Sequence, residues 1–259
     1  MIFMKMLRFK KIYIFLFFIY LILQFKDTLS LLFFFDTGAA DIRSLQPLVI
    51  KKYLVMDSLK IESLLFECSF YSSFLLPIMI TVLGYDYLSL KENYLKYYIG
   101  RAEGYRYQLE NLRVKLSFIP ITIFFMILLI IFSTSFFSGQ LDAQFLSSFA
   151  NRSFLNPIFS SLMSYIFFYL AMISIAILVN ARLYFKMLDY CRNFMKGAIF
   201  YLAFIWLLSS VLYHVLPYYF VPMNTIMFLS YDVTILNILL PYSLYILMFF
   251  VLERYTHEI

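Results

Sequence analysis

The sequence predicts an all-α fold: a polytopic membrane protein built as a bundle of six transmembrane helices. Of its 259 residues, 63% are hydrophobic and only 14% are charged, whereas soluble domains carry roughly 25% charged residues. A second observation is the spacing of the apolar residues, because six stretches approach the length of about 20 residues that crosses a bilayer. These stretches are 10–34, 68–85, 116–137, 157–179, 197–216 and 234–252. We therefore expect residues 1–259 to form a single transmembrane domain.

The first span, 10–34, is the least regular of the six. Its uninterrupted apolar run covers only 12–23. It reaches membrane length either if Lys10 and Lys11 extend their charges toward the interface or if the span continues past Lys26. The basic start of the chain resembles a secretory signal, but no small-residue cleavage site follows the apolar run. We therefore expect a retained membrane span.

The distribution of Lys and Arg predicts the orientation of the bundle. With the N-terminus in the cytoplasm, 15 of the 21 Lys and Arg residues lie in inner segments and 6 in outer segments. Cytoplasmic segments of membrane proteins carry the excess of positive charge. We therefore expect a multi-pass protein of the cell membrane with both termini in the cytoplasm.

Several connecting segments have distinctive compositions. The outer segment 36–67 mixes apolar residues with scattered charges, which is typical of short amphipathic helices on a membrane surface. The outer segment 217–233 is too apolar for a free loop and too short to span, so an interfacial or re-entrant helix fits it best. The inner segment 180–196 is predicted to be a short basic loop, and Asn180 is expected to cap a helix end.

The segment 86–115, between the second and third spans, holds ten charged residues in thirty positions. Residues 89–92, Ser-Leu-Lys-Glu, have the form of a capping box, which satisfies free backbone donors at a helix start. Gly100 is suited to ending a helix. The pattern predicts an amphipathic helix, a bend at 100–104, and a second helix that runs into the third span. We call 86–115 the coupling segment and expect it at the cytoplasmic surface.

The basic residues of the coupling segment have two interpretations. Arginine offers a planar, forked set of donors that suits carboxylates and phosphates. Arg101 and Arg106 can therefore hold anionic lipid headgroups, at about 1 kcal/mol each, or they can contact a protein partner. A mere turn needs only a few residues, and the near balance of six positive and four negative charges suits a protein surface. For the segment as a whole we favour the protein partner.

The stretch KENYLKYYIGRAEGYRYQLENLRVKL, together with the six-span layout, resembles the permease subunit of ABC-2-type exporters. In that family the second span is followed by a cytoplasmic helix with a pattern like G-x-(I/L)-(I/L)-x-R … Y-x-x-x-K, which 97–101 and 107–111 occupy here. The family's lysine corresponds to Asn111 or is displaced to Arg113. The resemblance implies that a separate ATPase subunit contacts this helix through Tyr98, Arg101, Arg106, Tyr107 and Arg113.

The resemblance also implies a function and partners. The chain is expected to be the membrane-spanning permease subunit of an exporter that moves a peptide or amphiphilic substrate outward, with a separate ATP-binding ABC subunit supplying the energy. It is expected to pair with an identical or similar permease subunit and to contact membrane lipid. The alternative is a non-transporting immunity or accessory protein that sequesters a toxin or scaffolds a partner.

The sequence predicts no catalytic, cofactor or metal site and no nucleic-acid partner. It contains no P-loop motif, so ATP hydrolysis would belong to a partner subunit, and we do not expect an enzyme. His214 lies near the outer end of the fifth span and His257 in the inner tail, too far apart to cooperate. Cys68 and Cys191 fall on opposite sides of the membrane, which excludes a disulfide, since bridged Cα atoms lie within about 7 Å.

Overall fold

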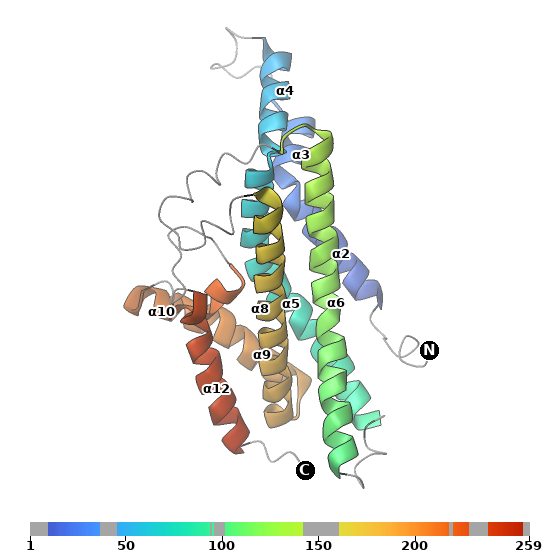
Figure 1. The fold of residues 1–259 in the computed structure, drawn as a ribbon, viewed down its shortest axis with the longest axis vertical. Helices are drawn as coiled ribbons and strands as arrows, with labels where there is room; N and C mark the ends of the chain where they lie inside the picture. Colours follow the sequence, from blue (N-terminus) through green and yellow to red (C-terminus); the bar gives the residue numbers. More distant parts are fainter. Residues whose placement is uncertain are drawn as a thin grey trace.

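The computed structural model describes residues 10–36, 46–93, 95, 102–141, 161–217, 220–227 and 238–255. Across these ranges the chain forms helices and no strands, which confirms the all-α class. The α-helices are α2 (Lys10–Gln24), α3 (Lys26–Phe33), α4 (Pro47–Ser58), α5 (Ile61–Asn93), α6 (Ala102–Phe137), α8 (Leu162–Cys191), α9 (Phe194–Leu202), α10 (Leu208–Val215) and α12 (Pro241–Tyr255). Figure 1 shows α5, α6 and α8 running along the length of the molecule, with α12 beside the lower half of α8.

Several helices are long and apolar enough to cross a membrane. Four stretches qualify by length and composition: Ile61–Asn93, Gly104–Phe137, Leu162–Cys191 and Phe194–Val215. The bent pair α2 and α3 adds a fifth if it counts as one span. The sixth predicted span, 234–252, corresponds to α12, whose 15 residues fall short of the about 20 that cross a bilayer. The described residues thus support a multi-pass membrane protein with four or five spans, and six spans are not confirmed.

The first span is broken at Phe25, where α2 and α3 meet at 62°. On the N-terminal side of this break, polar side chains of α2 form hydrogen bonds with the backbone of α5. Gln24 donates from Nε2 to the carbonyl of Leu64 at 2.7 Å, and the Tyr20 hydroxyl donates to the carbonyl of Cys68 at 3.0 Å. Gln24 and Tyr20 are both fully buried. An unpaired polar group in hydrocarbon is energetically costly. The face of α2 that carries these two side chains is therefore the face that packs against the bundle.

The described part of segment 36–67 contains α4 and the first turns of α5, and α4 packs beside α3. The hydroxyls of Thr28 and Ser58 lie 2.9 Å apart, and Lys51 Nζ donates to the carbonyl of Leu32 at 2.8 Å. Helix α4 itself buries none of its side chains. Helix α5 begins within this segment, earlier than the second span was predicted to start. The location of α4 on a membrane surface stays a prediction.

The structure corrects the prediction for the coupling segment. Helix α5 continues through Ser89 and Glu92 to Asn93, so no helix begins at the Ser-Leu-Lys-Glu motif and the capping-box interpretation is wrong. The preceding turns of α5 already satisfy the backbone donors that a cap would serve. Helix α6 begins at Ala102 and runs into the third span, as predicted. Its buried face includes Leu109, Leu112 and Leu116. The described part of the coupling segment therefore consists of the ends of two long helices, and a separate coupling helix is not confirmed.

The C-terminal part of the bundle is less regular. A π-helical turn, Ala203–Leu207, joins α9 to α10, and α10 leans away from α8 (Figure 1). The segment predicted over 217–233 is described at 217 and over 220–227, and a short 3-10 helix, η5 (Pro222–Thr225), forms there. Thr225 and the following Ile226 are 5% and 0% exposed. Their burial favours the re-entrant alternative over a helix that lies on the surface.

Candidate functional site

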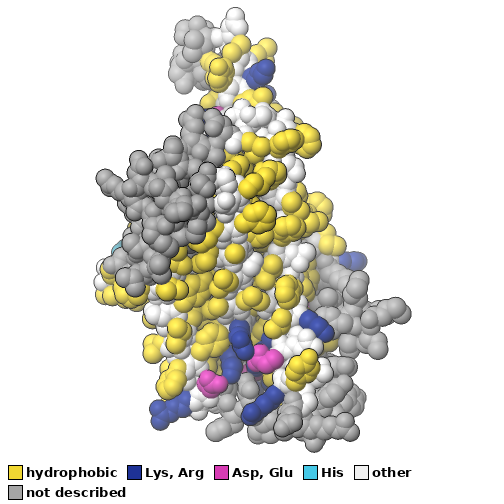
Figure 2. Space-filling model, in the orientation of Figure 1, with side chains coloured by type: hydrophobic (Ala, Val, Ile, Leu, Met, Phe, Trp, Pro, Cys, Tyr) yellow, Lys and Arg dark blue, Asp and Glu magenta, His cyan; other side chains and the backbone are white. Residues whose placement is uncertain are grey.

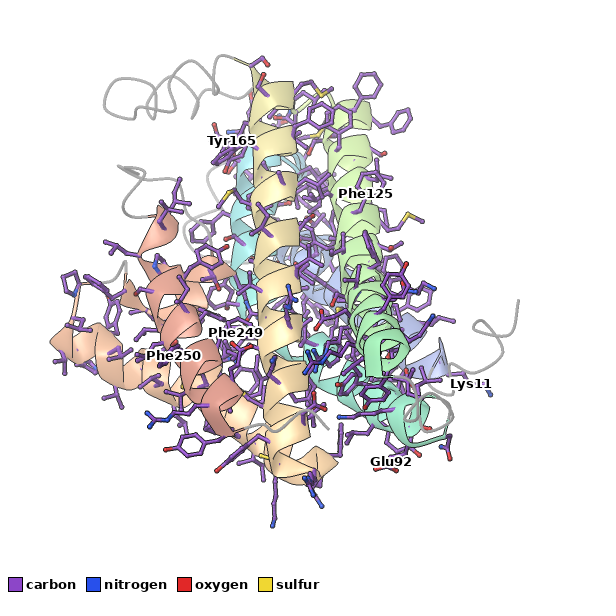
Figure 3. The ribbon with its side chains drawn as sticks, turned by 60° about the horizontal axis from the view of Figure 1, so that its bottom comes forward. Lys11, Glu92, Phe125, Tyr165, Phe249 and Phe250 are labelled. Atoms are coloured by element: carbon purple, nitrogen blue, oxygen red, sulfur yellow. The ribbon has the colours of Figure 1, made fainter. Side chains whose placement is uncertain are left out.

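Charged side chains gather at the end of the bundle where α5, α6 and α8 leave its apolar part. Figure 2 shows Lys, Arg, Asp and Glu side chains together at this end, below a broad surface of hydrophobic side chains. Figure 3 brings the same end forward, with Glu92 and Lys11 at its edge. Six side chains from the three helices interact directly, and we call them the ionic cluster: Tyr87, Lys91, Glu110, Arg113, Arg182 and Asp189.

Asp189, on α8, is the centre of the ionic cluster. The Tyr87 hydroxyl lies 2.9 and 2.8 Å from its two carboxylate oxygens and donates to them. Lys91 Nζ donates to Oδ1 at 2.7 Å, and Arg113 Nη2 donates to Oδ2 at 2.5 Å. The side chains of Asp189 and Arg113 are only 5% and 2% exposed. A buried charge requires this kind of pairing, and the carboxylate thereby connects α8 to both α5 and α6.

Arg113 contacts several other members of the cluster. Its Nη1 donates to Glu110 Oε1 at 2.5 Å, and its Nε donates to the Tyr87 hydroxyl at 3.4 Å. Glu110 also accepts a hydrogen bond from Arg182 Nη2 at 2.9 Å. The ring of Tyr87 stacks on Phe185 of α8, with 4.6 Å between the ring centroids. The guanidinium is thus held by two carboxylates and a phenol, so its orientation is fixed from three helices.

Helical spacing explains why these side chains meet. Tyr87 and Lys91 are one turn apart on α5, which places them on one face of the helix. The two α6 members are three residues apart and share a face for the same reason. Arg182 and Asp189 are two turns apart on α8. Each helix therefore contributes two polar or charged side chains from one face, and the three faces meet in the ionic cluster.

Comparison with protein-family models, curated proteins and solved structures found no match for this chain. The likeness of 91–116 to ABC-2 permeases therefore remains a resemblance in the sequence. Within the described ranges, no group of three or more His, Cys, Asp and Glu residues is placed to hold a metal ion. The described side chains at this end of the bundle form ion pairs and hydrogen bonds.

The five residues predicted to contact an ATPase differ in their surroundings. Tyr98 and Arg101 lie outside the described residues. Arg106 is exposed and the Tyr107 side chain is 70% exposed, so both are available to a partner. Arg113 is buried, and its guanidinium faces Asp189 instead of the surface. ATPase docking stays a prediction, and it now depends on the exposed residues at the start of α6.

Sequence reasoning missed the role of Asp189. Asp189 falls within 180–196, which is predicted to be a basic loop because the apolar run of the fourth span ends near 179. Helix α8 in fact continues to Cys191. A lone acidic residue among Arg182, Lys186 and Arg192 was the available signal, since an acid on the last turns of a helix can pair with basic residues of neighbouring helices.

A second polar group lies deeper in the bundle, around Asn180. The hydroxyls of Tyr201 and Tyr245 donate to Asn180 Oδ1 at 3.1 and 2.9 Å. Asn180 Nδ2 lies 3.4 Å from Thr225 Oγ1. The residue is fully buried in the middle part of α8, so the prediction that it caps a helix end is wrong. Asn180 instead joins α8 to α9, η5 and α12.

Proposed function

We propose that the chain is the membrane-spanning permease subunit of an ABC-2-type exporter, which moves a peptide or amphiphilic substrate outward with energy from a separate ATPase subunit. The observation that carries this proposal is the ionic cluster. It clamps the ends of α5 and α6 to α8, close to the exposed pair Arg106 and Tyr107. A partner that binds this pair would act on three helices together.

Long continuous helices would transmit a displacement from the ionic cluster to the apolar part of the bundle. Helix α6 has 36 residues, which corresponds to about 54 Å at 1.5 Å per residue. A displacement at Arg106 would therefore move the same rigid element through the apolar part of the bundle. The Arg113–Asp189 ion pair would pass the displacement to α8, and Asn180 would pass it on to α9 and α12. Packed elements that shift between discrete arrangements are the usual carriers of such coupling.

The proposal includes the finer topology that the sequence predicts. The subunit has six spans with both termini in the cytoplasm of a cell membrane, and the ionic cluster lies on the cytoplasmic side. Two permease subunits, identical or similar, form the pathway. The sequence has no P-loop, so this chain depends on its partner for ATP hydrolysis.

Co-purification tests this function with a matched pair of variants. Arg106→Glu/Tyr107→Ser changes the exposed Arg-Tyr pair of α6, and Arg254→Glu/Tyr255→Ser changes the exposed Arg-Tyr pair of α12. The chain is tagged, extracted from its native membrane in mild detergent, and the bound proteins are identified by mass spectrometry. We expect a stoichiometric P-loop ATPase with the wild type and the α12 variant. The α6 variant should recover about thirtyfold less, the effect of losing a contact worth about 2 kcal/mol.

Two outcomes contradict the proposal. In the first, the wild-type chain is recovered without an ATPase under conditions that keep other membrane complexes intact. In the second, both variants retain the ATPase equally. The first outcome favours the alternative, a non-transporting immunity or accessory protein.

A further inference from the structure

A long apolar groove runs along the surface between α2 and α6. Its lower part, about 680 Å³ in volume, is lined by Tyr13, Ile14 and Phe17 of α2 and by Phe118, Ile119, Thr122, Ile123 and Met126 of α6. A second part of about 630 Å³ continues toward Leu59 and the α4 end, and shares Phe17 and Met126 with the first. We call the lower part the α2–α6 groove.

Two lysines flank the mouth of the α2–α6 groove at the end of the bundle that carries the ionic cluster. Lys11 precedes Ile14 by three residues, and Lys115 precedes Phe118 by three residues. This spacing places each lysine on the same helix face as the lining residue that follows it. Both lysines are exposed, and Figure 3 shows Lys11 where α2 begins.

We propose that the α2–α6 groove binds an anionic phospholipid. The phosphate lies between Lys11 and Lys115, and an acyl chain lies along Ile14, Phe118 and Met126. Helix α6 rises about 12 Å between Phe118 and Met126, which is close to the about 15 Å of hydrocarbon in one leaflet. The site thus has a cationic end and an apolar channel of matching length.

Tyr13, which lines the groove, is hydrogen-bonded to an acidic group of α5. Asp86 is 2% exposed, and its Oδ2 accepts a hydrogen bond from the Tyr13 hydroxyl at 2.8 Å. The Asp86 carboxylate is therefore buried in the bundle, where it pairs with Tyr13.

Charge also distinguishes a lipid from a second copy of the chain. A two-fold axis normal to the membrane would bring the same patch of both copies together at the same depth. Lys11 and Lys115 of one copy would then face the lysines of the other, and like charges repel. A phosphate attracts both ammonium groups, and each basic residue near an anionic surface raises binding about fivefold.

Fluorescence quenching in vesicles tests the proposal. Trp206 is the sole tryptophan, so Phe118→Trp in a Trp206→Phe background places one reporter in the groove. The protein is reconstituted in phosphatidylcholine, and dibrominated phosphatidylglycerol or dibrominated phosphatidylcholine is added as quencher. We expect phosphatidylglycerol to be preferred about tenfold or more at this reporter. Lys11→Gln/Lys115→Gln should abolish the preference.

A control variant and a second measurement accompany this test. Lys196→Gln/Arg254→Gln removes two exposed positive charges from α9 and α12 and should leave the preference unchanged. Native mass spectrometry of the chain with Trp206 intact should retain phosphatidylglycerol, and lose it with Lys11→Gln/Lys115→Gln. Equal quenching by the two lipids overturns the proposal. Quenching by neither also overturns it, because it means that protein, such as a second copy, covers Phe118.

Discussion

Asp189 pairs with two cations and a phenol in a site where its side chain is 5% exposed. Burying an ion pair adds little net stability, because the desolvation cost offsets the attraction. Removing one partner is different, since the other charge stays buried and unpaired. The ionic cluster therefore fixes the positions of α5, α6 and α8 relative to one another, and it adds little to the net free energy of folding.

Asp189→Asn should lower the free energy of unfolding by about 3 kcal/mol. This is the lower end of the range for breaking a buried ion pair, because Glu110 still holds Arg113 from one side. Chemical unfolding in detergent, followed by circular dichroism, measures the loss. Arg182→Gln removes a more exposed ion pair and should cost less than about 1 kcal/mol. Equal losses in the two variants would show that the Asp189 pairing is not buried as described.

Gly84 permits a close approach between α5 and α8. A Cβ at this position would collide with the hydroxyl oxygen of Tyr184 and lie 2.6 Å from two of its ring carbons. Gly84→Ala should therefore lower the thermal unfolding temperature, with a loss of about 1–3 kcal/mol from overpacking. Gly197→Ala meets mainly the flexible end of Leu188 and should cost less. A neutral Gly84→Ala would mean that Tyr184 has room to move aside.

At the scale of elements, Asn180 holds η5 against α8. Hydrogen bonds inside membrane bundles contribute about 0.6 kcal/mol each on average, so Asn180→Leu should cost only about 1–2 kcal/mol in total. Its local effect should be larger, because Thr225 and Tyr245 lose a shared partner. A cysteine introduced at Met223 should react faster with a maleimide in the Asn180→Leu background than in the wild-type background. Unchanged reactivity would contradict the role given to Asn180.

The sequence predicted the helical elements better than their ends. Hydropathy located α5, α6 and α8, because each contains a long apolar stretch. It placed the ends of α5 and α8 too early, since apolar runs stop where the environment becomes polar and helices continue beyond that point. Asn180 was misread for this reason, because it falls at the end of an apolar run and yet lies inside α8.

The ionic cluster could not be predicted from the sequence in the same way. Its pairings join residues 76 and 102 positions apart, Arg113 with Asp189 and Tyr87 with Asp189. Periodicity within a helix identifies which side chains share a face, but it does not show which faces meet. The prediction that Arg113 contacts an ATPase requires an exposed side chain, but Arg113 is among the largest fully buried side chains in the described residues.

The whole molecule has a charged end, an apolar body and a helix, α4, that extends beyond the opposite end of the long helices (Figure 1). In the proposed exporter the charged end faces the cytoplasm. Reporter fusions test this orientation, and fusions at both termini should be active only with a reporter that works in the cytoplasm. Activity of a periplasmic or extracellular reporter at either terminus would contradict the six-span topology.

Site-specific photo-cross-linking in living cells tests the central claim, that a partner ATPase binds the exposed start of α6. Tyr107 and Tyr255 provide a matched pair, since both belong to this end of the bundle and their side chains are 70% and 63% exposed. A photoreactive phenylalanine at Tyr107 should capture a P-loop ATPase, identified by mass spectrometry, while the same group at Tyr255 should not. No ATPase adduct at Tyr107, or equal adducts at both positions, would contradict the account.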